Sequence, residues 1–260
     1  MRVGKGNKDI TNSSEIRNLH SSNVDADILP FPGFTDKFDL ETANEILRPL
    51  SARERIKWAV NMFGSGLHVL TSAGIDSALT LDHTSDVSEG NGPLEVTNVN
   101  TRLLPNGTLA HRETLRQQYG FRLHEFSPTK KAVDDILTRK LWESDISEYR
   151  QITKIIPLKR AIGALGVAAY ISGVRRDQTE QRSTFNYVHL GKAGEIRVHP
   201  FIDWSQSEVN RYIDSHELPR HPLYYEGYTS LDDWPLMGSD FMKTECGIHL
   251  NDDVLDEKAS

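Results

Sequence analysis

The chain has 260 residues, a formal net charge of −7 and one cysteine. That length is sufficient for one large domain with short appendages. The acidic balance argues against a protein whose whole surface binds nucleic acid, so no nucleic-acid partner is expected. A single cysteine can form neither a disulfide nor a four-cysteine iron–sulfur site within one chain, and both kinds of site are therefore excluded.

The N-terminal segment is polar and lacks apolar periodicity, which predicts a flexible arm over residues 1–30. The sequence contains no recognisable signal peptide or membrane-spanning segment, and the acidic residues of the arm argue against a transit peptide. We therefore expect a cytoplasmic protein that does not bind membranes.

From residue 51 onward the sequence alternates between predicted helices and strands. Ser51 and Glu54 form a capping-box pattern that predicts the start of the first helix. Helices are predicted over 51–64, from 77, over 108–119, 129–145, 157–165 and 205–216, strands over 67–71, 94–99, 121–126 and 167–172, and a hairpin over 187–201. Repeated strand–helix alternation indicates an α/β fold with an open, mostly parallel twisted sheet and helices on both faces.

Two loops of this predicted sheet carry unusual residues. Ligands of open parallel sheets bind at the carboxyl ends of the strands, which are followed here by the loops at 72–77 and 173–182. The first loop, "SAGIDS", has small residues and hydroxyls before a helix N-terminus, as expected of an anion-binding turn. An ordinary strand–helix turn can have the same composition.

The second loop, "GVRRDQTEQR", contains three arginines, whose guanidinium groups suit bidentate phosphate recognition. Residues 150–182 hold seven basic and two acidic side chains, a local charge of +5. This charge favours either a small polyanionic ligand or a solvated basic face.

The only cysteine, Cys246, lies in the polar stretch "KTECGIHL" near the end of the chain. Lys243, Glu245 and His249 surround it in the sequence, so this stretch is too polar for a core strand. A free cysteine is commonly a buried packing residue, but this setting favours a reactive nucleophile.

Six segments, taken in order, resemble the phosphoadenylyl-sulfate (PAPS) reductases. They are "TSAGIDSA" (71–78), "ITKIIPLKRAI" (152–162), "SGVRRDQTEQR" (172–182), "PFIDWSQSEVNRYI" (200–213), "HPLYYEGYTSL" (221–231) and "ECGIH" (245–249). The resemblance implies an adenine-nucleotide α-hydrolase-like fold, a homodimer, and reduction of an activated sulfate to sulfite with electrons from thioredoxin. It also implies a nucleotide-binding reductase domain over 31–232 and a C-terminal segment over 233–260 that carries the catalytic cysteine.

The resemblance implies roles for individual residues. Cys246 would be the nucleophile. Substrate binding would involve Ser72, Gly74, Asp76, Ser77, Lys154, Arg160, Arg175, Arg176, Arg182 and His249. No metal site is expected.

The chemistry of the chain agrees with such a reaction. A thiolate that attacks the sulfur of a phosphate–sulfate anhydride forms a Cys-S-sulfonate, and the local positive charge screens the approach of one anion to another. With no second cysteine, release of sulfite requires an external dithiol, thioredoxin or glutaredoxin. We expect the cluster-free branch of the family, with no bound cofactor and no iron–sulfur cluster, and a tail that is mobile from about residue 235 until nucleotide binds.

Two segments depart from the family pattern. Arg102 stands where a glycine is expected in "NTRLLPNGTLAHRET", and residues 232–243 are shorter and more acidic than in many members. Two other functions therefore stay open. An ATP pyrophosphatase that adenylates a substrate is one, because loop 72–77 matches five of six positions of the S-G-G-x-D-S pattern; a nucleotide-binding regulator without turnover is the other.

Overall fold

The structure is a computed structural model that describes residues 38–88, 90, 92–191 and 194–237. The predicted N-terminal arm and residues 238–260 of the predicted C-terminal segment, with Cys246 and His249, lie outside these residues. Among the described residues, none of the helices combines the length and the apolar character that a membrane span requires.

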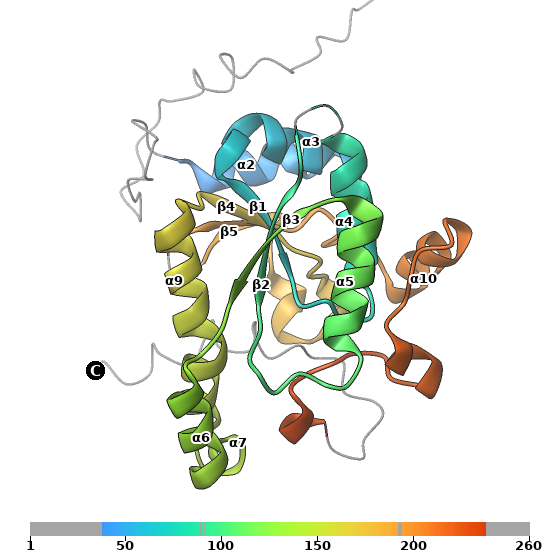
Figure 1. The fold of residues 1–260 in the computed structure, drawn as a ribbon. Coiled ribbons are helices and arrows are strands. Elements are labelled where there is room, and N and C mark those ends of the chain that lie inside the picture. Colours follow the sequence, from blue (N-terminus) through green and yellow to red (C-terminus); the bar gives the residue numbers. More distant parts are fainter. Residues whose placement is uncertain (1–37, 89, 91, 192–193, 238–260) are drawn as a thin grey trace, which may run out of the picture.

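A six-stranded sheet forms the centre of the described chain (Figure 1). Its order is β3-β2-β1-β4-β6-β5, and every neighbouring pair is parallel except β5 and β6, which form the predicted hairpin. The strands are β1 (Leu67–Thr71), β2 (Glu95–Val99), β3 (Arg122–Phe126), β4 (Ala169–Ile171), β5 (Val188–Leu190) and β6 (Ile196–Val198). The mostly parallel sheet predicted from the sequence is confirmed.

Helices cover both faces of the sheet, as predicted. Figure 1 shows α9 (Ile156–Leu165) on one side and α4 (Ser77–Val87) and α5 (Thr108–Tyr119) on the other. Alternate residues of a strand point to opposite faces, so Val69 joins the large core with α3 (Ala52–Phe63), α4 and α10 (Gln206–Ser215), whereas Leu70 joins a smaller core with α9. Burial on both faces applies to the central strands β1 and β4, in which every residue is buried, whereas the edge strand β3 is partly exposed and carries polar residues.

The helix predicted over 129–145 is divided in the structure. Lys140 adopts a left-handed conformation with φ of 47° and ends α6 (Lys130–Arg139). The chain then continues through α7 (Leu141–Ser144), α8 (Ile146–Arg150) and a π-helical turn, η2 (Gln151–Ile155), into α9. The π-helical turn was not predicted.

Helix α2 (Leu40–Leu47) was not predicted either, although its start has a local signal. The Asp39 carboxylate accepts hydrogen bonds from the backbone N–H groups of Glu41 (3.0 Å) and Thr42 (3.2 Å), which caps the helix. The remaining short turns of the described chain are the 3-10 turns η1 (Gly64–Gly66), η3 (Arg176–Gln178), η4 (Gln181–Thr184), η5 (Pro222–Glu226) and η6 (Trp234–Leu236).

The strand order reverses direction next to β1. The chain moves outward from β1 to β2 and β3, and then returns to the other side of β1 at β4. The loops after β1 and β4 therefore diverge, which leaves a crevice at their carboxyl ends where ligands of such sheets bind.

Candidate functional site

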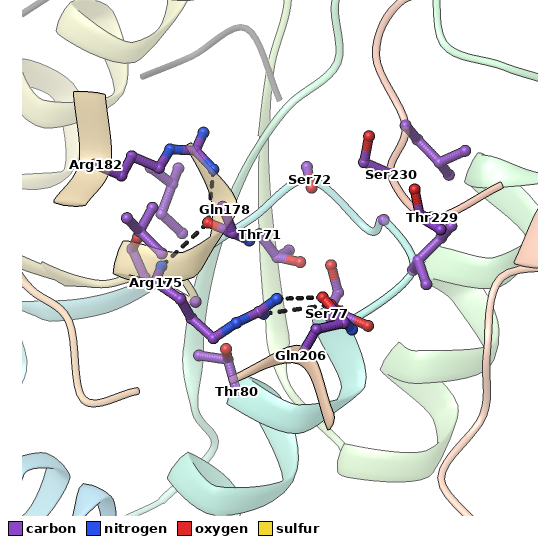
Figure 2. A pocket seen from close by; sticks show the side chains of 18 of the residues that line it. Thr71, Ser72, Ser77, Thr80, Arg175, Gln178, Arg182, Gln206, Thr229 and Ser230 are labelled. Carbon is purple, nitrogen blue, oxygen red and sulfur yellow. Dashed lines mark hydrogen bonds and ion pairs between the residues drawn. The ribbon is translucent and has the colours of Figure 1, made fainter. Parts of the chain in front are cut away.

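A cavity of about 340 Å³ lies at this crevice (Figure 2). It is lined by residues that follow β1 and β4 and by the segment 229–231. The lining residues with polar side chains are Thr71, Ser72, Asp76, Ser77, Thr80, Ser172, Arg175, Asp177, Gln178, Arg182, Gln206, Thr229 and Ser230. The two loops singled out in the sequence thus meet at one cavity.

Loop 72–77 leads into the N-terminus of α4. Ala73 has φ of 53°, a left-handed conformation that favours glycine, and its N–H donates to Thr71 Oγ1 at 3.1 Å. Position 73 is also where this loop departs from the S-G-G-x-D-S pattern. A Cβ on Gly74 would lie 3.2 Å from Ser72 Oγ, so the glycine leaves room for that hydroxyl.

The N-terminus of α4 has no side-chain cap among the described residues. Its N-cap residue, Asp76, instead accepts hydrogen bonds from Arg175 Nη1 (3.3 Å) and Gln206 Nε2 (3.1 Å). An uncapped helix N-terminus facing a cavity, with Ser72 and Ser77 beside it, is a suitable place for an anion.

Arg175 is a buried connector between three elements. Its Nη1 contacts Asp76, its Nε donates to Asp177 Oδ1 at 3.1 Å, and its Nη2 donates to Gln206 Oε1. The residue is 1% exposed. In the described structure these donors hold loop 173–182, the start of α4 and the start of α10 together, and Figure 2 shows the Arg175 guanidinium directed at Gln206.

The other basic residues of the prediction are placed differently. Arg182 lines the cavity and donates from Nη1 to Gln178 Oε1 at 2.6 Å. Arg176 donates from Nε to the Phe185 carbonyl and lies over the Tyr187 ring, and it is not among the cavity-lining residues. Arg160 is exposed and donates to the Ser127 carbonyl at 3.1 Å.

Lys154 lines a second, smaller cavity of about 30 Å³ that shares Ser72, Gly74 and Leu231 with the first. It lies in the π-helical turn η2, where it is buried. Turns of this kind are frequent at functional sites because they redirect one side chain out of the regular helix pattern. Lys154 Nζ lies 2.5 Å from Asp232 Oδ1.

The neighbouring Asp233 fastens the segment after residue 228 to the loop after β2 and to α8. Its carboxylate accepts hydrogen bonds from Tyr149 Oη (2.6 Å) and from Thr101 Oγ1, and lies 3.8 Å from Lys154 Nζ. Burial raises the pKa of Asp233, while the Lys154 charge opposes that shift. The strand-end loop and the C-terminal segment are therefore joined by a buried polar network.

Arg102, which stands where the family pattern has glycine, has φ of 64°. Its N–H donates to Asn100 Oδ1 at 2.9 Å and its Nε donates to the Pro128 carbonyl at 3.1 Å. The arginine thus keeps the left-handed backbone that the glycine of the pattern would favour, and local hydrogen bonds offset part of the strain.

Sequence reasoning missed a histidine pair behind the cavity. Ser172, which lines the cavity, lies 3.3 Å from His199 Nδ1, and His199 Nε2 lies 3.0 Å from His189 Nδ1. Burial lowers the pKa of His189 to about 4 and that of His199 well below its usual value, so both rings are neutral near pH 7. The only sequence signal was the hairpin that carries both histidines.

Thr229 and Ser230, also missed, add hydroxyls to the cavity from the C-terminal side. Within the described ranges, no group of three or more His, Cys, Asp and Glu side chains is arranged to hold a metal ion. The arrangement offers an anion a helix N-terminus, several hydroxyls and Arg182, with Lys154 in the adjoining cavity.

A family model described as "Phosphoadenosine phosphosulfate reductase domain" matches residues 66–239. A phosphoadenosine 5′-phosphosulfate reductase from Synechocystis sp. is 34% identical over 233 residues, which cover 82% of this chain and 92% of the relative. The chain belongs to the PAPS reductase family. A second reductase of that name, from Synechococcus sp., is 34% identical over 232 residues, or 81% of this chain and 97% of the relative.

One solved structure agrees with this PAPS reductase assignment, and another shares the fold. The structure of the PAPS reductase from Candida auris in a phosphate complex superposes with a TM-score of 0.64 at 26% identity, covering 75% of this chain and 93% of that one. The FMN adenylyltransferase of Candida glabrata has a TM-score of 0.54 at 14% identity, over 75% of this chain and 73% of that one, and shows a shared fold alone. The predicted family and fold class are thereby confirmed.

Proposed function

We propose that this protein reduces PAPS to sulfite and adenosine 3′,5′-bisphosphate in sulfate assimilation. The observation that carries the proposal is the cavity at the carboxyl ends of β1 and β4, in a chain of the PAPS reductase family. The uncapped N-terminus of α4, the hydroxyls that line the cavity and Arg182 suit a ligand with several anionic groups.

In this proposal the phosphosulfate lies against loop 72–77. The N–H groups at the start of α4 and the hydroxyls of Ser72 and Ser77 donate to its oxygens, and Gly74 allows the backbone to approach. Arg182 and Lys154 supply positive charge from two sides.

The remaining predicted residues take other roles. Asp76 is itself an anion and orients Arg175 rather than the substrate, so both act as positioning residues. Arg160 and Arg176 would have to leave their present carbonyl partners to reach the nucleotide. His249 lies outside the described residues, and its contact with substrate is proposed from the motif alone.

Cys246 is the proposed nucleophile, and it too lies outside the described residues. Its thiolate attacks the sulfur of the sulfate group, so that an S–S bond forms and the S–O bond of the anhydride breaks. Adenosine 3′,5′-bisphosphate leaves with the electron pair, and Cys246 becomes an S-sulfonate. The positive groups of the site offset the repulsion between the thiolate and its anionic target.

Release of sulfite requires a second thiol, because the chain has only one cysteine. A thiolate of reduced thioredoxin, or of a glutaredoxin, attacks Cys246 Sγ, and sulfite leaves with the bonding electrons. The second thiol of the donor then closes its disulfide and frees the Cys246 thiolate. A homodimer, a cytoplasmic location and a site without bound cofactor or iron–sulfur cluster are further parts of this proposal.

The proposal is tested by measuring sulfite release from PAPS and from adenylyl sulfate, each with and without reduced thioredoxin. We expect sulfite from PAPS only when thioredoxin is present, and none from the Cys246→Ser variant, because a serine hydroxyl is a far weaker nucleophile than a thiolate. Tight binding of adenosine 3′,5′-bisphosphate without sulfite release would favour a regulator, and pyrophosphate release from ATP would favour an adenylating enzyme.

A further inference from the structure

The cation of the smaller cavity is already paired with an acid of the same chain. Lys154 Nζ lies 2.5 Å from Asp232 Oδ1 and 3.8 Å from Asp233 Oδ2. The side chains of Lys154, Asp232 and Asp233 are 4%, 14% and 1% exposed, so solvent screens their charges only weakly.

The two carboxylates differ in their other contacts. Asp233 accepts hydrogen bonds from Tyr149 Oη and Thr101 Oγ1, both of which belong to the main body of the fold. Asp232 accepts, besides the Lys154 ammonium, a hydrogen bond from the backbone N–H of Asp233 at 2.8 Å. Asp233 is therefore the structural anchor, and Asp232 is the carboxylate whose interaction with the fold depends on Lys154.

This pair adjoins the place proposed for the phosphosulfate. Lys154, Asp232 and Asp233 line the small cavity together with Ser72 and Gly74, and these last two also line the large one. An anionic group held by loop 72–77 is thus brought next to an ammonium that already has a carboxylate partner. The same short segment contributes Thr229, Ser230 and Leu231 to the large cavity.

A ligand anion and the Asp232 carboxylate cannot share this buried ammonium without mutual repulsion. Two negative charges at a weakly screened site repel each other by several kcal/mol at about 4 Å, for an effective dielectric constant of about 20. A ligand oxygen gains the ammonium only when the carboxylate gives it up, which reduces the net gain from binding.

We propose that Asp232 is an affinity-determining residue, which competes with an anionic oxygen of the nucleotide for the Lys154 ammonium. This inference rests on the proposed function, because it assumes a phosphate- or sulfate-bearing nucleotide in the cavity. When the ligand takes the ammonium, Asp232 loses its contact with Lys154, while Asp233 keeps its contacts with Tyr149 and Thr101. Ligand binding is thereby coupled to the segment that leads toward Cys246.

The test compares the affinity for adenosine 3′,5′-bisphosphate of the wild-type chain, Asp232→Asn and Glu226→Gln by titration calorimetry. Asparagine keeps the size of Asp232 and the oxygen that accepts from the Asp233 N–H, but it removes the competing charge. Glu226 is an exposed acid six residues earlier that lines neither cavity, so it controls for the loss of one negative charge. We expect about tenfold tighter binding for Asp232→Asn, and less than about twofold change for the control.

A second pair of variants separates competition from a general change in the fold. In a Lys154→Met background no ammonium remains to compete for, so Asp232→Asn removes only the direct repulsion between its charge and the ligand, and its gain in affinity should be smaller than in the wild-type background. This non-additivity is the signature of a direct interaction between the two side chains. If Asp232→Asn does not fold, Asp232→Ser serves in its place.

The outcomes separate the competition from the proposed function. Unchanged or weaker binding by Asp232→Asn, with normal binding by the wild type, overturns the competition and leaves the proposed function standing. An equal gain in the Lys154→Met background overturns it as well. Failure of the wild-type chain to bind the nucleotide at all refutes the proposed function and, with it, this inference.

Discussion

Replacement of Arg175 by alanine should destabilise the fold more than it weakens nucleotide binding. The sequence predicts a phosphate contact for this arginine, but its donors contact Asp76, Asp177 and Gln206 in the structure. Alanine would leave two carboxylates at the cavity without this cation. It would also remove one of the links between the start of α10 and loop 173–182, where the Gln206 N–H still donates to Asp177 Oδ2.

The size of this loss of stability follows from how deeply the partners of Arg175 are buried. Breaking a buried ion pair by removing one member costs about 3–5 kcal/mol, because the remaining charge is left uncompensated. The Arg175 side chain is 2% exposed, but those of Asp76 and Asp177 are 18% and 32% exposed, so water can partly solvate the abandoned carboxylates. We therefore expect the lower end, about 3 kcal/mol, which corresponds to a fall in Tm of about 6–12 °C for a chain of this size.

The assay is urea and thermal unfolding followed by circular dichroism, with Arg176→Ala as the matched control. Arg176 is the adjacent arginine, and it makes one hydrogen bond to a carbonyl and one cation–π contact with Tyr187. Arg176→Ala should lower the free energy of unfolding by about 1 kcal/mol. If Arg175→Ala unfolds like the wild type and only its nucleotide affinity falls, the connector role assigned to this guanidinium is wrong.

Three further predictions concern charge, protonation and hydroxyl contacts. Arg182→Ala should weaken binding of adenosine 3′,5′-bisphosphate by about 1.5–3 kcal/mol in calorimetry, since Arg182 lines the cavity; unchanged affinity would contradict a phosphate contact. Histidines whose pKa is lowered by burial to about 4 or further stay neutral in the folded protein, while the unfolded chain takes up protons as the pH falls through 6.5. Stability should therefore fall from pH 8 to pH 5.5 by about 1.4 kcal/mol for each, or about 5–6 kcal/mol together, and a flat urea midpoint over this range would refute it. The histidines counted are His68, His111, His189 and His199. Ser172→Ala should weaken nucleotide binding by about 1 kcal/mol without lowering the free energy of unfolding in urea by more than about 1 kcal/mol, and equal affinities would exclude its hydroxyl from the contact.

The sequence predicted the parts of the site that depend on strand ends. Loops 72–77 and 173–182 each follow a short strand that the sequence predicts to be buried, and parallel strands bring such loops to one edge of the sheet, so their meeting at one cavity could be expected. The β5–β6 hairpin was equally predictable from its alternation around a glycine-containing turn.

The pairing of charges was not predictable in the same way. Lys154 and Asp232 lie far apart in the sequence, and nothing in either local pattern indicates that they meet. Counting charges over 150–182 gave +5, but Arg175 and Lys154 have acidic partners from other parts of the chain. Local composition therefore overstated the positive charge available to a ligand.

The backbone details depended on tertiary structure as well. The π-helical turn at 151–155 joins α8 to α9. Neither helix has a sequence pattern that signals an extra residue between them, so the turn that places Lys154 inside depends on how the helices pack. Helix α2 has the Asp39 cap as its sequence signal, yet it is only eight residues long, and a helix of that length depends on packing for its stability.

The central claim is that Cys246 takes the sulfonate group from PAPS, and the most direct measurement is mass spectrometry of the protein incubated with PAPS in the absence of reductant. The account predicts one adduct of about 80 Da per chain, on the peptide that contains Cys246, which reduced thioredoxin removes with release of an equal amount of sulfite. Sulfite formation without any adduct on that peptide, or an adduct at another residue, would contradict it.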